Sequence, residues 1–193
     1  MRQKDKSGNT CPVIWWPSEV PTLSYGLTTL RALTSADIPD VYRELQDPVI
    51  HQFTTILPNY TMEDAKLYVT KKATQYLAEK NELAFGIVHD EIFSGVVSLH
   101  DIHLADHCAE VGYWIAAPMR RKGIGSTAVR LITEYAFTTM AFRRIEAKVD
   151  VKNEASNALF LKEGFEFEAI MRSAKTALDG TQEDMVLYSA IFG

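Results

Sequence analysis

Residues 119–132, MRRKGIGSTAVRLI, place three consecutive cationic side chains directly before a Gly-x-Gly turn and an apolar helical pattern. Glycine at 123 and 125 lets backbone N–H groups converge on a ligand with no Cβ in the way. The helix that begins there adds unpaired N–H donors and a partial positive charge, while Arg and Lys add charged donors. The segment therefore predicts a site for a phosphate-rich anion. The alternative is an ordinary strand-to-helix turn with solvated charges.

Two other phosphate-binding motifs can be compared with this segment. A Walker loop needs G-x-x-x-x-G-K-[ST], and no glycine precedes Lys122 at that spacing. GIGSTA does satisfy the dinucleotide pattern G-x-G-x-x-[GA], and Glu146 follows roughly twenty residues later. However, that pattern should come directly after a buried strand, and here a stretch containing Pro118 follows Ile115 first. The rest of the chain is also too short for the further βα units of such a fold, so both motifs are disfavoured.

A second group of reactive side chains lies in LHDIHLADHCAE, residues 99–110, which contains His100, His103, His107 and Cys108. These are metal-ligand types, but their spacing is a poor match to known zinc motifs, and a polar loop between strands gives no fixed geometry. We therefore expect no metal. The histidines could instead touch a substrate at the rim of a cleft, with His107 best placed. Cys11 and Cys108 show no redox spacing and suit a reducing compartment as well as a disulfide.

The composition describes one ordinary globular domain. The chain has 193 residues, of which 47% are hydrophobic and 23% charged. A formal net charge of −5 argues against a general nucleic-acid binder. The apolar stretch near the N-terminus is too short for a signal peptide, and no later run is long enough to span a bilayer. We expect a cytoplasmic protein without membrane contact.

Hydrophobic periodicity predicts a single α+β domain with the element order β-α-α-β-β-β-α-β-α-β-β and a mixed, mostly antiparallel sheet. Residues 1–26 have no periodicity and are predicted to form an N-terminal arm that packs through Trp15 and Trp16. Strands are expected at 26–33, at 83–100 as a hairpin around His89-Asp90-Glu91, at 109–117, at 143–151, and in two final segments joined through Asp179-Gly180. Helices are expected from residue 34 to a stop at Pro48, over 61–80 with Thr61 and Asp64 as a capping pair, over 123–140, and from Asn153 to a C-terminal Gly164.

Several of these segments together resemble one family. R-R-K-G-I-G at 120–125 resembles the Q/R-x-x-G-x-G/A acyl-CoA loop of the GNAT acetyltransferases. AEVGYWI at 109–115 looks like the fourth strand of its RimJ/RimL-like branch, which acetylates ribosomal-protein N-termini. NEASNALFLKEGF at 153–165 looks like the following helix, RALTSADIPDVYRELQDP at 31–48 like the opening strand and helix, and DGTQEDMVLYS at 179–189 like the closing hairpin. The resemblance covers residues 27–193 and implies one GNAT domain with helices on both faces of its sheet.

The resemblance also implies a cofactor and where it binds. Acetyl-CoA would lie in a gap between two splayed parallel strands, 109–117 and 143–151. The backbone from Trp114 to Ala117 would pair with the pantetheine amides, and N–H groups of residues 121–126 would hold the pyrophosphate. The residues implied to contact the cofactor are Trp114, Ile115, Ala117, Arg120, Arg121, Lys122, Gly123, Ile124, Gly125, Ser126, Asn153 and Phe160.

The implied reaction is transfer of the acetyl group to a primary amine, by direct attack in a ternary complex. The acceptor would be a protein N-terminus or a small-molecule amine, and a homodimer is plausible by analogy. The alternative is an acyl-CoA-binding sensor without turnover. Phe160 gives this alternative some support, because many family members carry a tyrosine at that position.

Acetyl transfer needs a neutral amine, a polarised carbonyl and a proton for the leaving thiolate. Glu110, at the start of one cleft strand, could accept the amine's proton through water or merely attract a cationic substrate. Glu146 on the other cleft strand is a second candidate base. Ser156 lies where the resembling branch carries a hydroxyl and is expected to protonate the thiolate, unless it is an ordinary first-turn serine. Asn153 could touch the CoA arm or simply cap its helix, and a strand N–H near Trp114 or Ile115 is expected to polarise the carbonyl.

Overall fold

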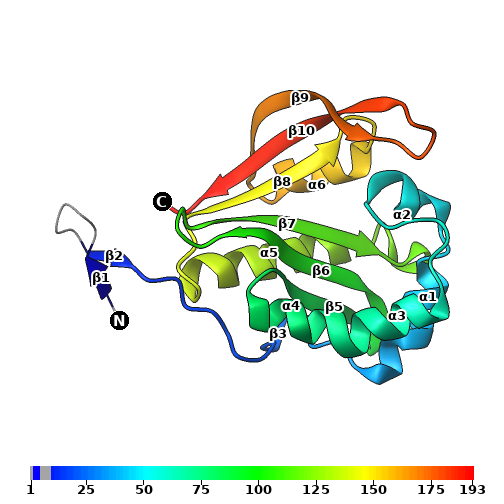
Figure 1. The fold of residues 1–193 in the computed structure, drawn as a ribbon, viewed down its shortest axis with the longest axis horizontal. Helices are drawn as coiled ribbons and strands as arrows, with labels where there is room; N and C mark the ends of the chain where they lie inside the picture. Colours follow the sequence, from blue (N-terminus) through cyan, green and yellow to red (C-terminus); the bar gives the residue numbers. More distant parts are fainter. Residues whose placement is uncertain (1, 5–9) are drawn as a thin grey trace.

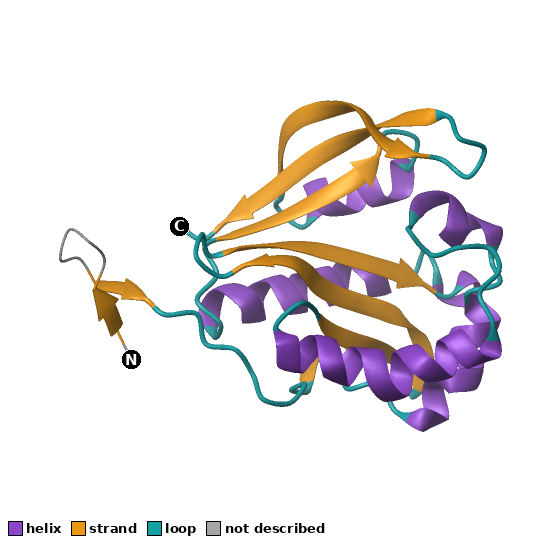
Figure 2. Ribbon diagram, in the orientation of Figure 1, coloured by secondary structure: helices purple, strands orange, loops and turns teal. Residues whose placement is uncertain are grey.

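The computed structural model describes residues 2–4 and 10–193. Its body is an eight-stranded sheet in the order β3-β4-β5-β6-β7-β8-β10-β9, with helices on both faces (Figure 1 and Figure 2). The strands are β1 Arg2–Lys4, β2 Thr10–Pro12, β3 Leu23–Tyr25, β4 Thr28–Arg31, β5 Leu83–His89, β6 Ile92–His103, β7 Cys108–Ile115, β8 Arg144–Asp150, β9 Glu166–Thr176 and β10 Gln182–Ile191. The helices are α1 Ile38–Glu44, α2 Pro48–Phe53, α3 Met62–Leu67, α4 Ala73–Glu79, α5 Ile124–Thr138 and α6 Glu154–Lys162, with short 3₁₀ turns at Ser35–Asp37 and Ala117–Met119 and a π-helical turn at Tyr68–Lys72. The predicted fold class is confirmed.

Two hydrophobic cores lie on opposite faces of the sheet. Helix α5 packs behind β4, β6 and β7, whereas α1, α3 and α4 cover the other face (Figure 1). Successive residues of a strand point to opposite faces. In β7, Val111 and Ile115 therefore belong to the α5 core, and Trp114 packs with Val41 and Phe93 on the other side. This alternation decides which β7 side chains face each half of the site.

The strands β7 and β8 form the one parallel pair of this sheet, and they stay paired only briefly. Cys108–Glu110 align with Arg144–Glu146, and no pairing continues beyond these positions. From there β7 remains paired to β6 and β8 to β10, so the two strands diverge (Figure 1). The predicted splay of the two strands is confirmed. Among the described residues, no strand pairs with the edge of β7 that faces β8 from Val111 to Ile115.

The predicted element order omits the short strands β1–β3 before β4 and a helix, α2, that follows α1. Pro48 was expected to stop a helix, but it occupies the first turn of α2, where its missing N–H costs nothing. Asp47 caps this helix by accepting a hydrogen bond from Val49 N–H at 2.9 Å. The expected capping pair of Thr61 and Asp64 is present at the start of α3. The expected long helix at 61–80 is interrupted by the π-helical turn.

The N-terminal segment is joined to the body more closely than an aperiodic arm would suggest. Strand β3 extends the sheet beside β4, and β1 pairs with β2 away from the body (Figure 1). Trp16 donates a hydrogen bond from Nε1 to the Leu77 carbonyl at 2.8 Å, whereas Trp15 is 51% exposed. Residues 1 and 5–9 of the predicted arm lie outside the described residues, and the boundary at residue 26 stays a prediction. No helix in the described part of the chain has the length and apolar character needed to cross a membrane.

Candidate active site

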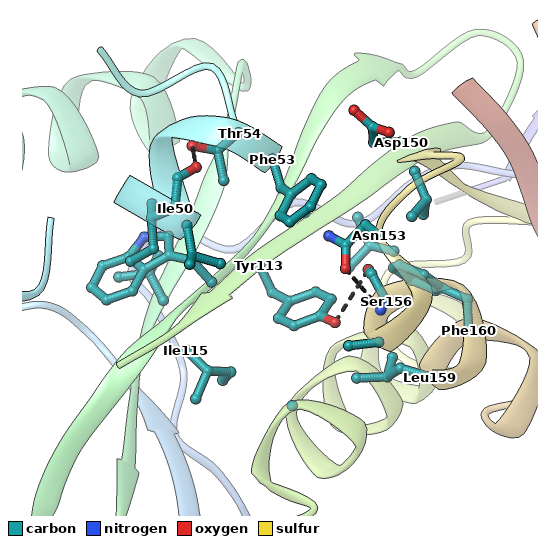
Figure 3. A pocket seen from close by; sticks show the side chains of 18 of the residues that line it. Ile50, Phe53, Thr54, Tyr113, Ile115, Asp150, Asn153, Ser156, Leu159 and Phe160 are labelled. Atoms are coloured by element: carbon teal, nitrogen blue, oxygen red, sulfur yellow. Dashed lines mark hydrogen bonds between the residues drawn. The ribbon is translucent and has the colours of Figure 1, made fainter. Parts of the chain in front are cut away.

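A cavity of about 1300 Å³ opens where β7 and β8 diverge. Figure 3 shows Tyr113 of β7, Ser156 of α6 and Asn153, the N-cap residue of α6, pointing toward one another in it, with Phe53 of α2 nearby. The first residues of α5 line the same cavity. The cavity therefore brings together the unpaired edge of β7, the starts of two helices, and side chains from both faces of the sheet.

The Gly-x-Gly turn forms the start of α5. Gly123 is the N-cap residue in a left-handed conformation, with φ of 78°, and as a glycine it has no side chain that could cap the helix. The N–H groups of Ile124, Gly125 and Ser126 therefore point out of the helix end without intrahelical partners. Arg121 also adopts positive φ, at 63°. Residue 121 and residues 123–126 border the cavity, whereas Lys122 does not. Such a helix end can bind an anionic group.

The three cations before the turn have different environments. The Arg120 Nε donates a hydrogen bond to the Ile115 carbonyl at 3.0 Å, and its guanidinium forms an ion pair with Asp47 at 2.6 Å. Lys122 directs Nζ to Met119 Sδ at 3.6 Å and does not line the cavity. Within the described residues, no ion pair or hydrogen bond engages the Arg121 side chain, which lines the cavity. Arg121 is thus the cation best placed for a bound anion, whereas Arg120 holds the turn against β7 and α2.

Hydroxyl groups meet on the α5 side of the gap. Tyr113 donates a hydrogen bond from Oη to Ser156 Oγ at 3.2 Å, and Ser156 N–H donates to Asn153 Oδ1 at 3.1 Å (Figure 3). Burial raises the pKa of Tyr113, so its phenol stays protonated. Phe160 is 2% exposed and packs on the Tyr113 ring. The phenol of this site therefore comes from β7, and Tyr113 was missed in the sequence because strand alternation alone does not show what lies across the gap.

Charged groups gather on the other face of the same gap. The Glu110 carboxylate accepts a hydrogen bond from Lys148 Nζ at 2.7 Å and lies 3.6 Å from His100 Nε2. Burial alone would raise the pKa of Glu110, but His100 and Lys148 together hold the pKa below its usual range. Glu82 also lines the cavity, and burial raises the pKa of its carboxyl.

The structure corrects the expectation for the histidines. His107 was expected to be the best placed, but its Nδ1 lies 3.0 Å from the Ala141 carbonyl, and it does not line the cavity. His100 lines it instead. The alternation of β6 could have indicated His100, but the sequence does not fix the register between β6 and β7.

Comparison with known proteins identifies the family. The Acetyltransferase (GNAT) domain family matches residues 28–166. The chain belongs to the GNAT acetyltransferase family. It is 33% identical over 114 residues, 59% of this chain and 62% of the relative's length, to YdaF of Bacillus subtilis, provisionally named a ribosomal N-acetyltransferase. It is 27% identical over 173 residues, 89% of this chain and 97% of the relative, to the uncharacterized N-acetyltransferase YoaA of the same species.

Solved GNAT structures share the fold. RimJ from Mycobacterium smegmatis, in complex with a CoA disulfide, superposes with a TM-score of 0.81 at 21% identity, covering 92% of this chain and 90% of that chain. The predicted family and its RimJ/RimL-like neighbourhood are thus confirmed. Membership supports acetyl transfer over the alternative of a sensor.

The two N–H groups expected to polarise the thioester carbonyl, those of Trp114 and Ile115, lie on different edges of β7 in this GNAT domain. Ala116 N–H donates to the Ser94 carbonyl at 2.9 Å, on the β6 side. Because N–H groups alternate between the two edges of a strand, the Trp114 N–H shares that side, and the Ile115 N–H faces the gap. The Trp114 side chain packs in the second core. Of the other residues expected at the cofactor, Ala117 does not line the cavity.

The remaining candidates lie beside the GNAT cavity. Glu146 does not line it; its carboxylate accepts a hydrogen bond from Arg144 at 2.6 Å beside a separate pocket of about 340 Å³ that also includes His103 and Cys108. Burial and the nearby Glu146 raise the pKa of the Cys108 thiol to about 11, so it is protonated and a poor nucleophile at neutral pH. Among the described residues no group of three or more ligand-type side chains could hold a metal.

Proposed function

We propose that this GNAT protein transfers the acetyl group of acetyl-CoA to a primary amine by direct attack in a ternary complex. The observation that carries the proposal is the cavity between the diverging ends of β7 and β8, which joins an uncapped helix start to a free strand edge. The pyrophosphate would lie on the N–H groups of residues 121–126, with Arg121 beside it. The pantetheine would lie along the free edge of β7.

The acyl group would then lie beside Ile115, whose N–H would donate to the thioester oxygen as charge develops on it. Ser156 would give the leaving thiolate a proton, supported by Tyr113. Because Tyr113 donates to Ser156 Oγ, the serine's own proton is free to point at the sulfur. Asn153 would fix the start of α6 and thereby the position of Ser156. Direct attack requires no nucleophilic cysteine, in keeping with a protonated Cys108.

Of the two classes of acceptor, a peptide N-terminus is favoured. The acceptor would occupy the part of the cavity between α2 and β9, which are joined by a hydrogen bond from Lys175 Nζ to the Gln52 carbonyl at 2.5 Å. Apolar side chains such as Phe53 and Met171 line it, which suits the chain of a peptide. The carboxylates Glu82 and Glu110 would attract its ammonium group. A relative with a provisional ribosomal name points the same way. A cytoplasmic location and a homodimer stay predictions.

The test is calorimetric titration with acetyl-CoA, followed by measurement of CoA release with three sets of acceptors. These are peptides with a free N-terminus, the same peptides with a blocked N-terminus, and small amines. We expect binding, and release with the free peptides only. Release with small amines alone would replace the peptide by a small acceptor. Binding without release across the panel would favour the sensor, and absence of binding would overturn the proposal.

A further inference from the structure

A histidine lies between two carboxylates on the face of the sheet opposite α5. The acetyl transfer proposed for this protein does not yet give this histidine a role. His100 of β6 is directly opposite Glu110 of β7 in the strand register. On the other side of β6, Leu83 pairs with Leu99 in an antiparallel register. Glu82, just before Leu83, therefore lies beside His100, just after Leu99. All three side chains line the cavity. The sheet register therefore builds a Glu-His-Glu row across three neighbouring chain segments.

The imidazole lies directly on β7, at the edge of the gap. A Cβ added to Gly112 would be 2.7 Å from His100 Cε1, so the ring occupies the space that any side chain at 112 would need. Gly112 precedes Tyr113, whose hydroxyl meets Ser156 on the opposite face. The imidazole and the Tyr113–Ser156 pair thus flank the same stretch of β7 from opposite faces. An amine entering from the His100 face would meet a thioester whose sulfur lies toward Ser156.

The imidazole ring of His100 also has a nitrogen that can accept a proton. Its Nε2 faces Glu110, and in the described part of the chain no hydrogen bond engages Nδ1. The side chain is 39% exposed and lines the cavity. Glu110 itself is held ionised by Lys148, which makes it a poor base but a good partner for an imidazolium.

We propose that His100 is a further catalytic residue of this enzyme, the group that takes the proton from the acceptor's ammonium, and that Glu110 is its positioning residue. This inference rests on the proposed acetyl transfer and assigns its base.

Acetyl transfer removes two protons from the acceptor nitrogen, because an ammonium group has three N–H protons and the amide product keeps one. Neutral His100 takes the first, which frees the nitrogen lone pair to attack the carbonyl carbon. The N–C bond forms, the C–S bond breaks, and the second proton reaches the CoA sulfur by way of Ser156. His100 then releases its proton to solvent before the next turnover, and no other reactant is needed.

The surroundings set the pH at which His100 can act. Burial alone would lower the pKa of His100, but Glu110, Glu82 and Asp101 together raise the pKa above its usual value. The other polar groups nearest to this row are Lys148, which pairs with Glu110, and Tyr68, which lies within reach of Glu82. Activity should therefore rise with pH through an acidic limb that lies above the ordinary range of a histidine side chain.

The experiment compares His100→Gln with His103→Gln, a control on the same strand that lies outside the cavity. The kinetic constants are measured across pH with the acceptor peptide and with an analogue in which a hydrazide replaces the N-terminal amine. The acceptor nitrogen of this analogue is already neutral. We expect His100→Gln to lower kcat by about 10²-fold or more with the peptide and to move the acidic limb to higher pH, because the peptide's own α-amino group, with a pKa of about 7.7–8.0, must then lose its proton without a base. It should keep its affinity for acetyl-CoA within about twofold, and its loss with the hydrazide should be much smaller. His103→Gln should behave as the wild type.

Two further variants test the geometry. Gly112→Ala should push the imidazole off β7 and lower kcat in the wild type, but add nothing to His100→Ala. Glu110→Gln should move the acidic limb to lower pH. Equal losses with the peptide and the hydrazide, or an unchanged acidic limb in His100→Gln, would overturn the proposal while leaving acetyl transfer intact. No CoA release by the wild type with any amine would overturn acetyl transfer and this assignment together.

Discussion

Tyr113 Oη donates a hydrogen bond to Ser156 Oγ at 3.2 Å and so connects β7 to α6 across the gap between the diverging strands. The two residues are 43 positions apart in the chain and meet only because β8 and α6 turn back toward β7. The bond leaves the serine's proton free while the tyrosine's proton is engaged. It therefore suggests unequal roles for the two hydroxyls.

Ser156→Ala should lower kcat by about 10²-fold, the low end of what a general acid contributes. Tyr113→Phe should cost about tenfold, because it removes only the support of the serine. The double variant should be no slower than Ser156→Ala. Steady-state CoA release gives the rates, and calorimetry should show acetyl-CoA affinity within about threefold of wild type. Full kcat in Ser156→Ala would remove the serine from the mechanism.

Of the cations before the turn, Arg121 should contribute to acetyl-CoA binding and Arg120 to the stability of the fold. Arg121→Ala should weaken acetyl-CoA binding several-fold and make it less dependent on salt, because a free guanidinium near the phosphates is lost. Arg120→Ala should lower the free energy of unfolding by about 1–3 kcal/mol, since it removes hydrogen bonds made by a charged group to Ile115 and Asp47. Lys122→Ala is the matched control and should change neither quantity.

Denaturant titration and calorimetry on the three variants give both quantities. Weak binding in Lys122→Ala together with normal binding in Arg121→Ala would contradict this assignment of the cations.

The two glycines of the turn serve different purposes. A Cβ at Gly123 would meet nothing within 4 Å, but its φ of +78° strains any other residue. A Cβ at Gly125 would approach Leu159 Cδ1 at 3.1 Å and Tyr113 Cε2 at 3.2 Å. Gly125→Ala should therefore destabilise the fold by about 1–3 kcal/mol through overpacking and slow turnover by displacing the Tyr113 ring. Gly123→Ala should cost about 1 kcal/mol through backbone strain and affect turnover less.

Urea unfolding and CoA release on the two variants separate these effects. Equal loss of turnover in both would show that the Tyr113 contact does not matter.

The amino-acid sequence contains enough local information to predict the anion-binding turn and most of the sheet. Glycine spacing and flanking cations act over a few residues, so the residue types alone locate the start of α5. The prediction at Pro48 is wrong because a proline suits both the first turn of a helix and the position just after its end. Both positions are compatible with a Pro, and only the cap from Asp47 distinguishes them.

The catalytic arrangement was harder to predict, because it depends on pairing between distant segments. His100 meets Glu110 through the β6–β7 register, and that register shifts between His100 and His103. A one-residue slip would have turned His100 to the opposite face. Glu146 shares a face with Glu110 in the paired part of β7 and β8, but Arg144 engages it. Strand alternation could not show which of these carboxylates reaches the cavity.

The junction of β4 and α1 should give the fold a pH-dependent stability. Asp37 accepts hydrogen bonds from Arg31 at 2.7 and 2.8 Å and from Thr34 N–H at 2.7 Å. Burial alone would raise the pKa of this carboxyl, but Arg31 and Thr34 lower the pKa overall. Asp37→Asn should therefore lower the free energy of unfolding by about 2 kcal/mol at neutral pH. Asp40→Asn, in the partly exposed pair with Arg43, is the control and should cost less than about 1 kcal/mol.

The sign of the pH effect follows from the lowered pKa of Asp37. A carboxyl whose pKa is lower in the folded state stabilises that state fully above its unfolded pKa of about 3.9, and this stabilisation is lost as the pH falls through the folded pKa. The difference between wild type and Asp37→Asn should thus stay constant from about pH 7 to about pH 5 and shrink below about pH 4. Urea unfolding at several pH values measures it. A difference that grew on acidification would mean that burial, and not Arg31, dominates the pKa of Asp37.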